Sequence, residues 1–196
     1  MHKENCFILT GAPGSGKSTI VRLLREKGFT CVDEPARQII SEQRAINGSG
    51  TSDKDPSLFI ELMLSRAISR YHDIGNTSGP VFFDRGVADN IAYALLYDLP
   101  FERGWAAAKL FRYNATVFFA PNWRDIYTTD EERTMTFEAS APMGDSLRTV
   151  YQKLGYEVVD LPLSTPEKRV ACMVEHSSRV KIMSSGFKLG TRSWRS

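Results

Sequence analysis

The chain has 196 residues, a length typical of one domain, and 42% of them are hydrophobic, which suffices for a sizeable core and excludes a disordered protein. Its 25 basic and 23 acidic residues leave a formal net charge of +2, so no nucleic-acid surface and no membrane patch are expected. No apolar run approaches the roughly 18 residues of a membrane-spanning helix, and no signal peptide is expected. Cys6, Cys31 and Cys172 are isolated in apolar segments, which is typical of buried thiols in a reducing compartment and indicates a cytoplasmic location.

The most specific motif follows the first expected strand, residues 6–10. It fits the pattern G-x-x-x-x-G-K-[S/T] of a phosphate-binding P-loop and reads Gly11-Ala12-Pro13-Gly14-Ser15-Gly16-Lys17-Ser18-Thr19. The glycines allow several backbone N–H groups to point at one anion, at the positive end of the helix that follows. The motif predicts that this loop binds ATP, that Lys17 reaches its β- and γ-phosphates, and that the Ser18 hydroxyl ligates Mg²⁺.

Strand-like and helix-like segments alternate along the chain, which predicts an α/β fold with a parallel sheet and helices on both faces. Strands are expected over residues 6–10, 29–33, 80–84, 115–119 and 156–160. Helices are expected over residues 17–27, 35–46, 57–73, 87–98, 101–113, 123–133, 144–154 and 166–183. Residues 47–56 read as a flexible loop inside the domain. We therefore expect one domain over residues 1–183 and a loosely ordered tail over 184–196.

In an open α/β sheet the ligand lies outside the carboxyl ends of the strands. Glu34 follows the second expected strand, where a carboxylate can accept a proton from an attacking hydroxyl or help to hold Mg²⁺. Asp33 is an alternative for the same role. Glu34 could instead be only a stabilising acid at a helix N-terminus, with Pro35 at the first helical position.

Asp84 ends the third expected strand and fits the position at which a carboxylate supports Mg²⁺. Arg85 follows it, where hydrolysing motor ATPases usually carry a water-activating Glu. A guanidinium is not a base, but it can clamp an anionic substrate or the transferring phosphoryl group. The alternative is a surface ion-pair partner. Asp89, one helical turn further on, could orient Arg85.

A polar segment over residues 123–137 follows the fourth expected strand, where P-loop kinases carry a mobile lid. Arg124 and Arg133 are candidates to stabilise charge on the transferring phosphoryl group when this lid closes. The alternative is a solvated charged helix. Trp123, Tyr127 and Tyr93 could stack on a base or belong to the core. Residues 161–165, after the fifth strand, could support an adenine.

In their order along the chain, these motifs resemble the nucleoside and nucleotide kinase branch of the P-loop proteins. The deoxyribonucleoside kinases carry a similar Glu-Pro pair, in which the Glu is the general base, an acidic-Arg pair and an arginine lid; they usually have Ser at the position of Gly86. The segments Phe83-Asp84-Arg85-Gly86-Val87-Ala88-Asp89 and Trp123-Arg124-Asp125-Ile126-Tyr127 look more closely like AAA-domain ATPases, which are similar to the ribosylnicotinamide kinase domain. This resemblance implies a P-loop NTPase three-layer sandwich with strand order 2-3-1-4-5.

The leading functional hypothesis is a kinase that transfers phosphate from ATP–Mg²⁺ to a small molecule resembling a nucleoside, a nucleotide or a vitamin precursor. One alternative is a regulatory ATPase or GTPase switch without a small acceptor. Another is a kinase of nucleic-acid ends, which the near-neutral charge disfavours. The sequence identifies neither the acceptor nor the oligomeric state, and a homodimer stays open.

Overall fold

The computed structural model describes residues 1–75, 77–127 and 136–185, with side chains up to residue 178. The strands are β1 (Cys6–Thr10), β2 (Thr30–Val32), β3 (Val81–Asp84), β4 (Thr116–Phe119) and β5 (Glu157–Asp160). The helices are α1 (Lys17–Glu26), α2 (Ala36–Ala45), α3 (Pro56–Asp73), α4 (Asp89–Leu96), α5 (Glu102–Leu110), the 3₁₀ turn η1 (Arg124–Ile126), α6 (Phe137–Lys153) and α7 (Pro166–Ser185). Within the described residues, no helix is long and apolar enough to cross a membrane.

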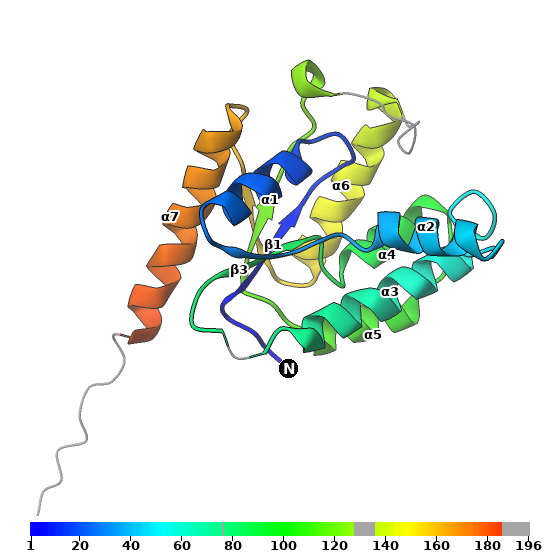
Figure 1. Ribbon diagram of the computed structural model, residues 1–196, viewed down its shortest axis with the longest axis horizontal. Coiled ribbons are helices and arrows are strands. Elements are labelled where there is room, and N and C mark those ends of the chain that lie inside the picture. The colour runs from blue at the N-terminus through cyan, green and yellow to red at the C-terminus, as the bar shows by residue number, and fades with distance from the viewer. Residues whose placement is uncertain (76, 128–135, 186–196) are drawn as a thin grey trace, which may run out of the picture.

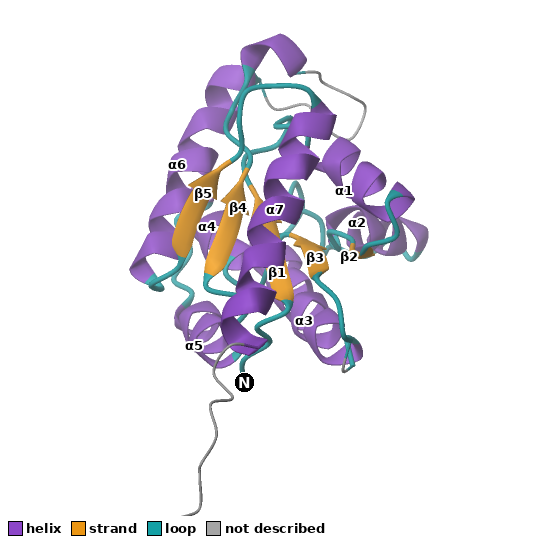
Figure 2. Ribbon diagram, turned by 90° about the vertical axis from the view of Figure 1, so that its left-hand side faces the viewer, coloured by secondary structure: helices purple, strands orange, loops and turns teal. Residues whose placement is uncertain are grey.

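The five strands form one parallel sheet in the order β2-β3-β1-β4-β5, as the sequence predicted (Figure 2). β1 lies at the centre of the sheet and pairs with β3 on one side and with β4 on the other. All the strands therefore end at one edge, and the P-loop leaves the sheet from the middle of that edge. This edge is where an open α/β sheet binds its ligands.

Two cores, one on each face of the sheet, follow from the alternation of side chains along each strand. In β1, Cys6 and Ile8 belong to a core shared with α3, α4 and α6. Phe7 and Leu9 belong to the opposite core, which they share with α1 and α7. The helices therefore cover both faces, and the predicted three-layer sandwich is confirmed (Figures 1 and 2). The three central strands β1, β3 and β4 are almost entirely apolar because both of their faces are buried.

The expected helix over 123–133 was wrong in its described part. Trp123 has extended backbone angles, and the chain then makes only the short turn η1 before Tyr127, which is again extended. Residues 128–133 lie outside the described residues, as does most of the tail expected over 184–196.

Helix α6 begins at Phe137, seven residues before the expected start at residue 144. Pro142 and Gly144, two residues that are unfavourable in a helix interior, both lie inside it. The side chain of Thr136 accepts a hydrogen bond from the N–H of Ala139 at 3.2 Å and caps the helix. Gly144 is buried against Asn122 and Ala12, so the early part of α6 packs against the P-loop.

Candidate active site

The P-loop backbone adopts the glycine-dependent shape that its sequence predicted. Gly14 and Gly16 have φ angles of 78° and 83°, in the left-handed region. Gly11 has a φ of 140°, and a Cβ there would lie 2.2 Å from the carbonyl oxygen of Ala120, the residue after β4. The loop ends at the first turn of α1, where Ser18 and Thr19 are exposed and available to a ligand. Pro13, between Ala12 and Gly14, is partly buried.

The side chain of Lys17 is buried and folds back onto its own loop. Its Nζ donates hydrogen bonds to the carbonyl oxygens of Gly11 and Ala12, both at 2.9 Å. Burial, reinforced by the positive charge of Arg85, lowers the pKa of Lys17 to about 7. The Lys17 ammonium is thus held by neutral carbonyls, and a phosphate could replace them as its partner.

Glu34, Arg85 and Asp89 form an ion-pair network beside the loop. Arg85 Nε donates to Glu34 Oε1 at 2.6 Å, and Nη1 donates to Asp89 Oδ1 at 3.1 Å. The same Nη1 donates to the carbonyl of Gly11 at 3.0 Å, which ties the network to the P-loop. Burial of Glu34 favours its neutral form, but Arg85 outweighs this effect and lowers the pKa of Glu34 below its usual value. Glu34 is therefore ionised at neutral pH.

The carboxylate of Asp89 accepts hydrogen bonds from four donors in this network. Its Oδ1 accepts from Thr10 Oγ1 at 2.6 Å as well as from Arg85. Its Oδ2 accepts from the N–H of Gly86 at 2.8 Å and from Tyr151 Oη at 2.5 Å. The sequence analysis identified Asp89 but not Thr10 or Tyr151, because α6 carries no motif that marks Tyr151 as a partner. Four donors fix this carboxylate, and it in turn fixes the guanidinium of Arg85.

The turn at Arg85 and Gly86 explains one departure from the deoxyribonucleoside kinase pattern. Arg85 has a φ of 68°, which is uncommon for a bulky residue and costs conformational energy. A Cβ at Gly86 would lie 2.6 Å from Ile8 Cδ1 and 3.1 Å from Tyr151 Oη. The Ser that those kinases usually have here would therefore require the side chain of Ile8 to shift.

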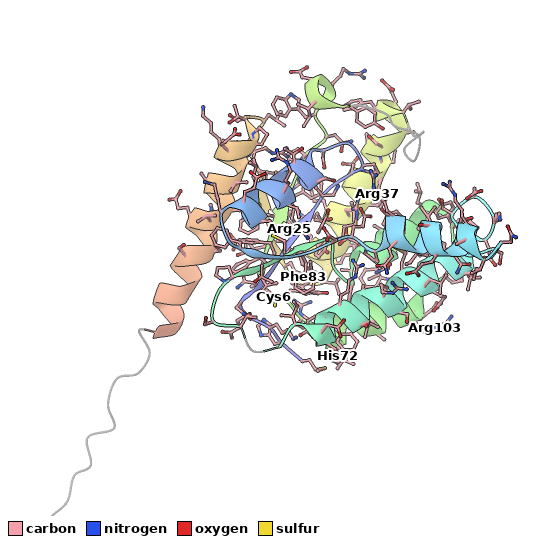
Figure 3. All side chains as sticks on the ribbon, in the orientation of Figure 1. Cys6, Arg25, Arg37, His72, Phe83 and Arg103 are labelled. Carbon is pink, nitrogen blue, oxygen red and sulfur yellow. The ribbon has the colours of Figure 1, made fainter. Side chains whose placement is uncertain are left out.

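A pocket opens between the ends of β2 and β3 and the helices α3 and α4. Phe83, which Figure 3 shows in the interior, lines it together with Met63, Asp84, Arg85 and Asn90. Asp84 Oδ1 and Asn90 Oδ1 are buried there without a hydrogen-bond partner. Each oxygen can accept a hydrogen bond or a cation, so the pocket suits a ligand that brings donors.

The residues predicted to bind Mg²⁺ fit that ion. Burial, together with the negative charge of Glu34, raises the pKa of Asp84 to about 6, and a nearby cation would offset both effects. Ser18 supplies a hydroxyl at the mouth of the loop. The described residues contain no cluster of three or more His, Cys, Asp or Glu side chains for a metal. Mg²⁺ keeps several of its waters and takes few protein ligands beside phosphates.

The described part of the expected lid lies against the loop. A Cβ at Gly14 would lie 2.4 Å from the ring of Tyr127, so this ring rests on the P-loop. Arg124 pairs with Glu138 at 2.5 Å, and its guanidinium lies 4.3 Å from the centre of the Phe137 ring. Arg124 is thus connected to the start of α6. Arg133 lies outside the described residues.

Among the aromatic candidates, Tyr93 has a defined place in the network. Its Oη donates to Glu34 Oε1 at 3.2 Å, and its ring centre lies 5.5 Å from the Arg85 guanidinium. Trp123 Nε1 donates to Asp125 Oδ2 at 3.0 Å.

Asp33, the alternative to Glu34, pairs at 2.7 Å with Arg25 on α1 instead. The geometry therefore favours Glu34 over Asp33 as the carboxylate of the site.

A family model described as an AAA domain matches residues 6–169, which include every described residue of this site. The chain belongs to this AAA-domain family. A search of curated proteins found no match.

Several solved structures share the fold. Deoxyadenosine kinase from M. mycoides, with dCMP and dCDP bound, superposes with a TM-score of 0.64 and 12% identity over 89% of this chain and 99% of the kinase. Thymidylate kinase from Ehrlichia chaffeensis superposes with a TM-score of 0.61 and 14% identity, over 90% of this chain and 99% of that kinase. The NadR protein in complex with NR superposes with a TM-score of 0.62 and 23% identity over 96% of this chain. This chain spans 54% of the length of NadR. The chain therefore has the P-loop fold of the nucleoside and nucleotide kinases.

Proposed function

We propose that this protein is a kinase that transfers the γ-phosphoryl group of ATP to a small molecule resembling a nucleoside, a nucleotide or a vitamin precursor. The observation that carries the proposal is the Glu34–Arg85–Asp89 network, which joins the P-loop to the neighbouring pocket. A loop that only binds nucleotide needs no such ionised carboxylate at the edge of a pocket. The kinase fold and the family assignment support the same conclusion.

In this proposal the P-loop residues 11–19 bind the phosphates of ATP, and Lys17 moves from the carbonyls of its own loop to the β- and γ-phosphates. The acceptor lies in the pocket, where one of its hydroxyls donates to Asn90 Oδ1. Arg85 neutralises charge on the group in transfer, and a closing lid adds Arg124 and Arg133. Mg²⁺, held through Ser18 and Asp84, supplies further neutralisation of the phosphate charge when it is bound.

Glu34 is the proposed general base. Both contacts to its carboxylate are made to Oε1, so within the described residues Oε2 has no donor. The acceptor hydroxyl donates its proton to this oxygen while its own oxygen bonds to the γ-phosphorus, and the bond from that phosphorus to the β-phosphate oxygen breaks. ADP leaves with the electron pair of that bond, and the proton on Glu34 later passes to solvent.

A first experiment screens small molecules for one that stimulates the release of ADP from ATP. A pair of variants, assayed with that acceptor, then tests the mechanism. Glu34→Gln keeps the shape and removes the base, so turnover should fall by on the order of 100-fold with ATP affinity nearly unchanged. Arg85→Lys keeps the charge but loses the planar fork, and turnover should also fall. An acceptor that already carries a phosphate would need no base, and only the Arg85 variant would then be impaired.

The outcome that contradicts the proposal is equally specific. If both variants retain full acceptor-stimulated turnover, the network is structural. If ATP binds and no acceptor stimulates its use, a regulatory ATPase becomes the better account.

A further inference from the structure

Arg169, in the first turn of α7, is buried against the P-loop. Arg169 is only 2% exposed, and its Nη1 donates a hydrogen bond to the carbonyl oxygen of Ser15 at 2.8 Å. A Cβ at Gly16 would lie 2.9 Å from this same Nη1 and 3.1 Å from Ile126 in η1. The guanidinium therefore lies between the last helix, the loop and the beginning of the lid segment.

Within the part of the chain that the structure describes, the rest of this guanidinium has no partner. Its Nε and Nη2 are both buried and make no hydrogen bond. These two groups form the edge on which the N–H bonds of arginine run parallel, the edge that binds two oxygens of one phosphate or carboxylate. One hydrogen bond to Ser15 thus leaves unused the part of the side chain that is best suited to an oxyanion.

Arg169 also lacks a counterion. None of the ion pairs formed by the described residues includes it, in contrast to Arg85, which is paired with Glu34 and Asp89. Burial lowers the pKa of Arg169. An unpaired buried charge is destabilising, and an anion that binds to it offsets this effect. A neutral base would supply acceptor atoms but would leave the charge uncompensated.

The anion available at this place is the one that the P-loop is built to bind. Arg169 touches the loop at Ser15 and Gly16, immediately before the N-terminus of α1, where the helix dipole also favours negative charge. We propose that the free Nε–Nη2 edge of Arg169 binds two phosphate oxygens of the donor nucleotide, so that the last helix of the domain senses whether the P-loop is occupied. This inference rests on the proposed function for the identity of the anion.

Calorimetric titrations of the full chain with ATP, with inorganic tripolyphosphate and with adenosine test this assignment. Arg169→Lys keeps a positive charge and a donor for Ser15 but removes the parallel pair, so it should weaken ATP and tripolyphosphate binding about tenfold. Arg169→Gln also removes the charge and should weaken both by about tenfold to a hundredfold. Adenosine binding should be unchanged in both variants. Lys168→Gln, at the exposed neighbouring position, removes the same charge and should bind like the parent protein.

Two results would overturn the inference. In the first, Arg169→Lys binds ATP and tripolyphosphate as tightly as the parent protein, so the free edge has no role. In the second, adenosine binding falls while tripolyphosphate binding does not, so the edge contacts the base. Unfolding midpoints of each variant show whether a loss arises from a misfolded loop. Binding without any acceptor-stimulated turnover would count against the kinase and leave the phosphate contact intact.

Discussion

At the scale of single residues, the buried carboxylate of Asp89 is the point on which the site depends. Tyr151 approaches it from α6 and donates at 2.5 Å, with its own hydroxyl fully buried. Tyr151→Phe should lower the free energy of unfolding by about 1–3 kcal/mol, because one hydrogen bond to a buried charge is lost and no water can replace it. Urea denaturation measures this change.

The same substitution should lower the acceptor-stimulated turnover, because Arg85 loses part of the support for its orientation. Tyr97→Phe is the matched control, since Tyr97 is 37% exposed and should be neutral in both measurements. Equal stability of the two variants would show that the Tyr151–Asp89 contact contributes nothing.

The residues that the sequence revealed were those that follow strands. The P-loop, Glu34, Asp84 and Arg85 could be predicted because parallel strands end at one edge of the sheet. Tyr151 and Arg169 were missed, since one lies in the last turn of α6 and the other in the first turn of α7, and both reach the site only through tertiary packing. A search of the first turn of α7, four residues beyond the loop at 161–165, would have found Arg169.

At the scale of elements, the lid segment is the part whose state should change with ligands. Tyr127 rests on Gly14, and its ring centre lies 5.4 Å from that of Phe137, so this segment contacts both the loop and α6. We expect amide hydrogen exchange over residues 123–137 to slow several-fold when ATP, Mg²⁺ and an acceptor are added. Exchange over the buried strand β1 should not change and serves as the reference. Equal exchange over 123–137 with and without ligands would contradict a closing lid.

The strand positions were predictable to within about one residue, but the start of α6 was not. Local propensity correctly registers Pro142 and Gly144 as unfavourable in a helix. Their cost is offset by the Thr136 cap and by the burial of Met143 and Gly144 near the P-loop, which are tertiary effects. Short windows of sequence do not predict such packing.

At the scale of the whole molecule, Phe82 shows how the central sheet is stabilised. Its ring is fully buried, 5.5 Å from Phe29 and 5.8 Å from Phe7 between ring centres. Phe82→Ala should cost about 3–5 kcal/mol of stability through lost burial and the cavity left behind. Urea denaturation checks this value. Phe82→Leu preserves most of the volume, should cost under about 1.5 kcal/mol, and keeps the test meaningful if the Ala variant does not fold.

Leu163→Ala is the control for this series, because Leu163 is 57% exposed and its loss should change stability by less than about 0.5 kcal/mol. If Phe82→Ala and Leu163→Ala were equally stable, the cluster of rings around β3 would not be part of the cooperative core.

The hydrogen bond between Arg169 and Ser15 joins residues that are 154 positions apart in the chain. β1, which carries the loop, pairs with residues that follow it by about 75 and 110 positions. Contacts of such long range close slowly, because chain entropy must be lost before they form. During synthesis Ser15 would emerge from the ribosome 154 residues before Arg169. The support that α7 gives to the P-loop is therefore acquired late in folding, although the loop itself is made long before it.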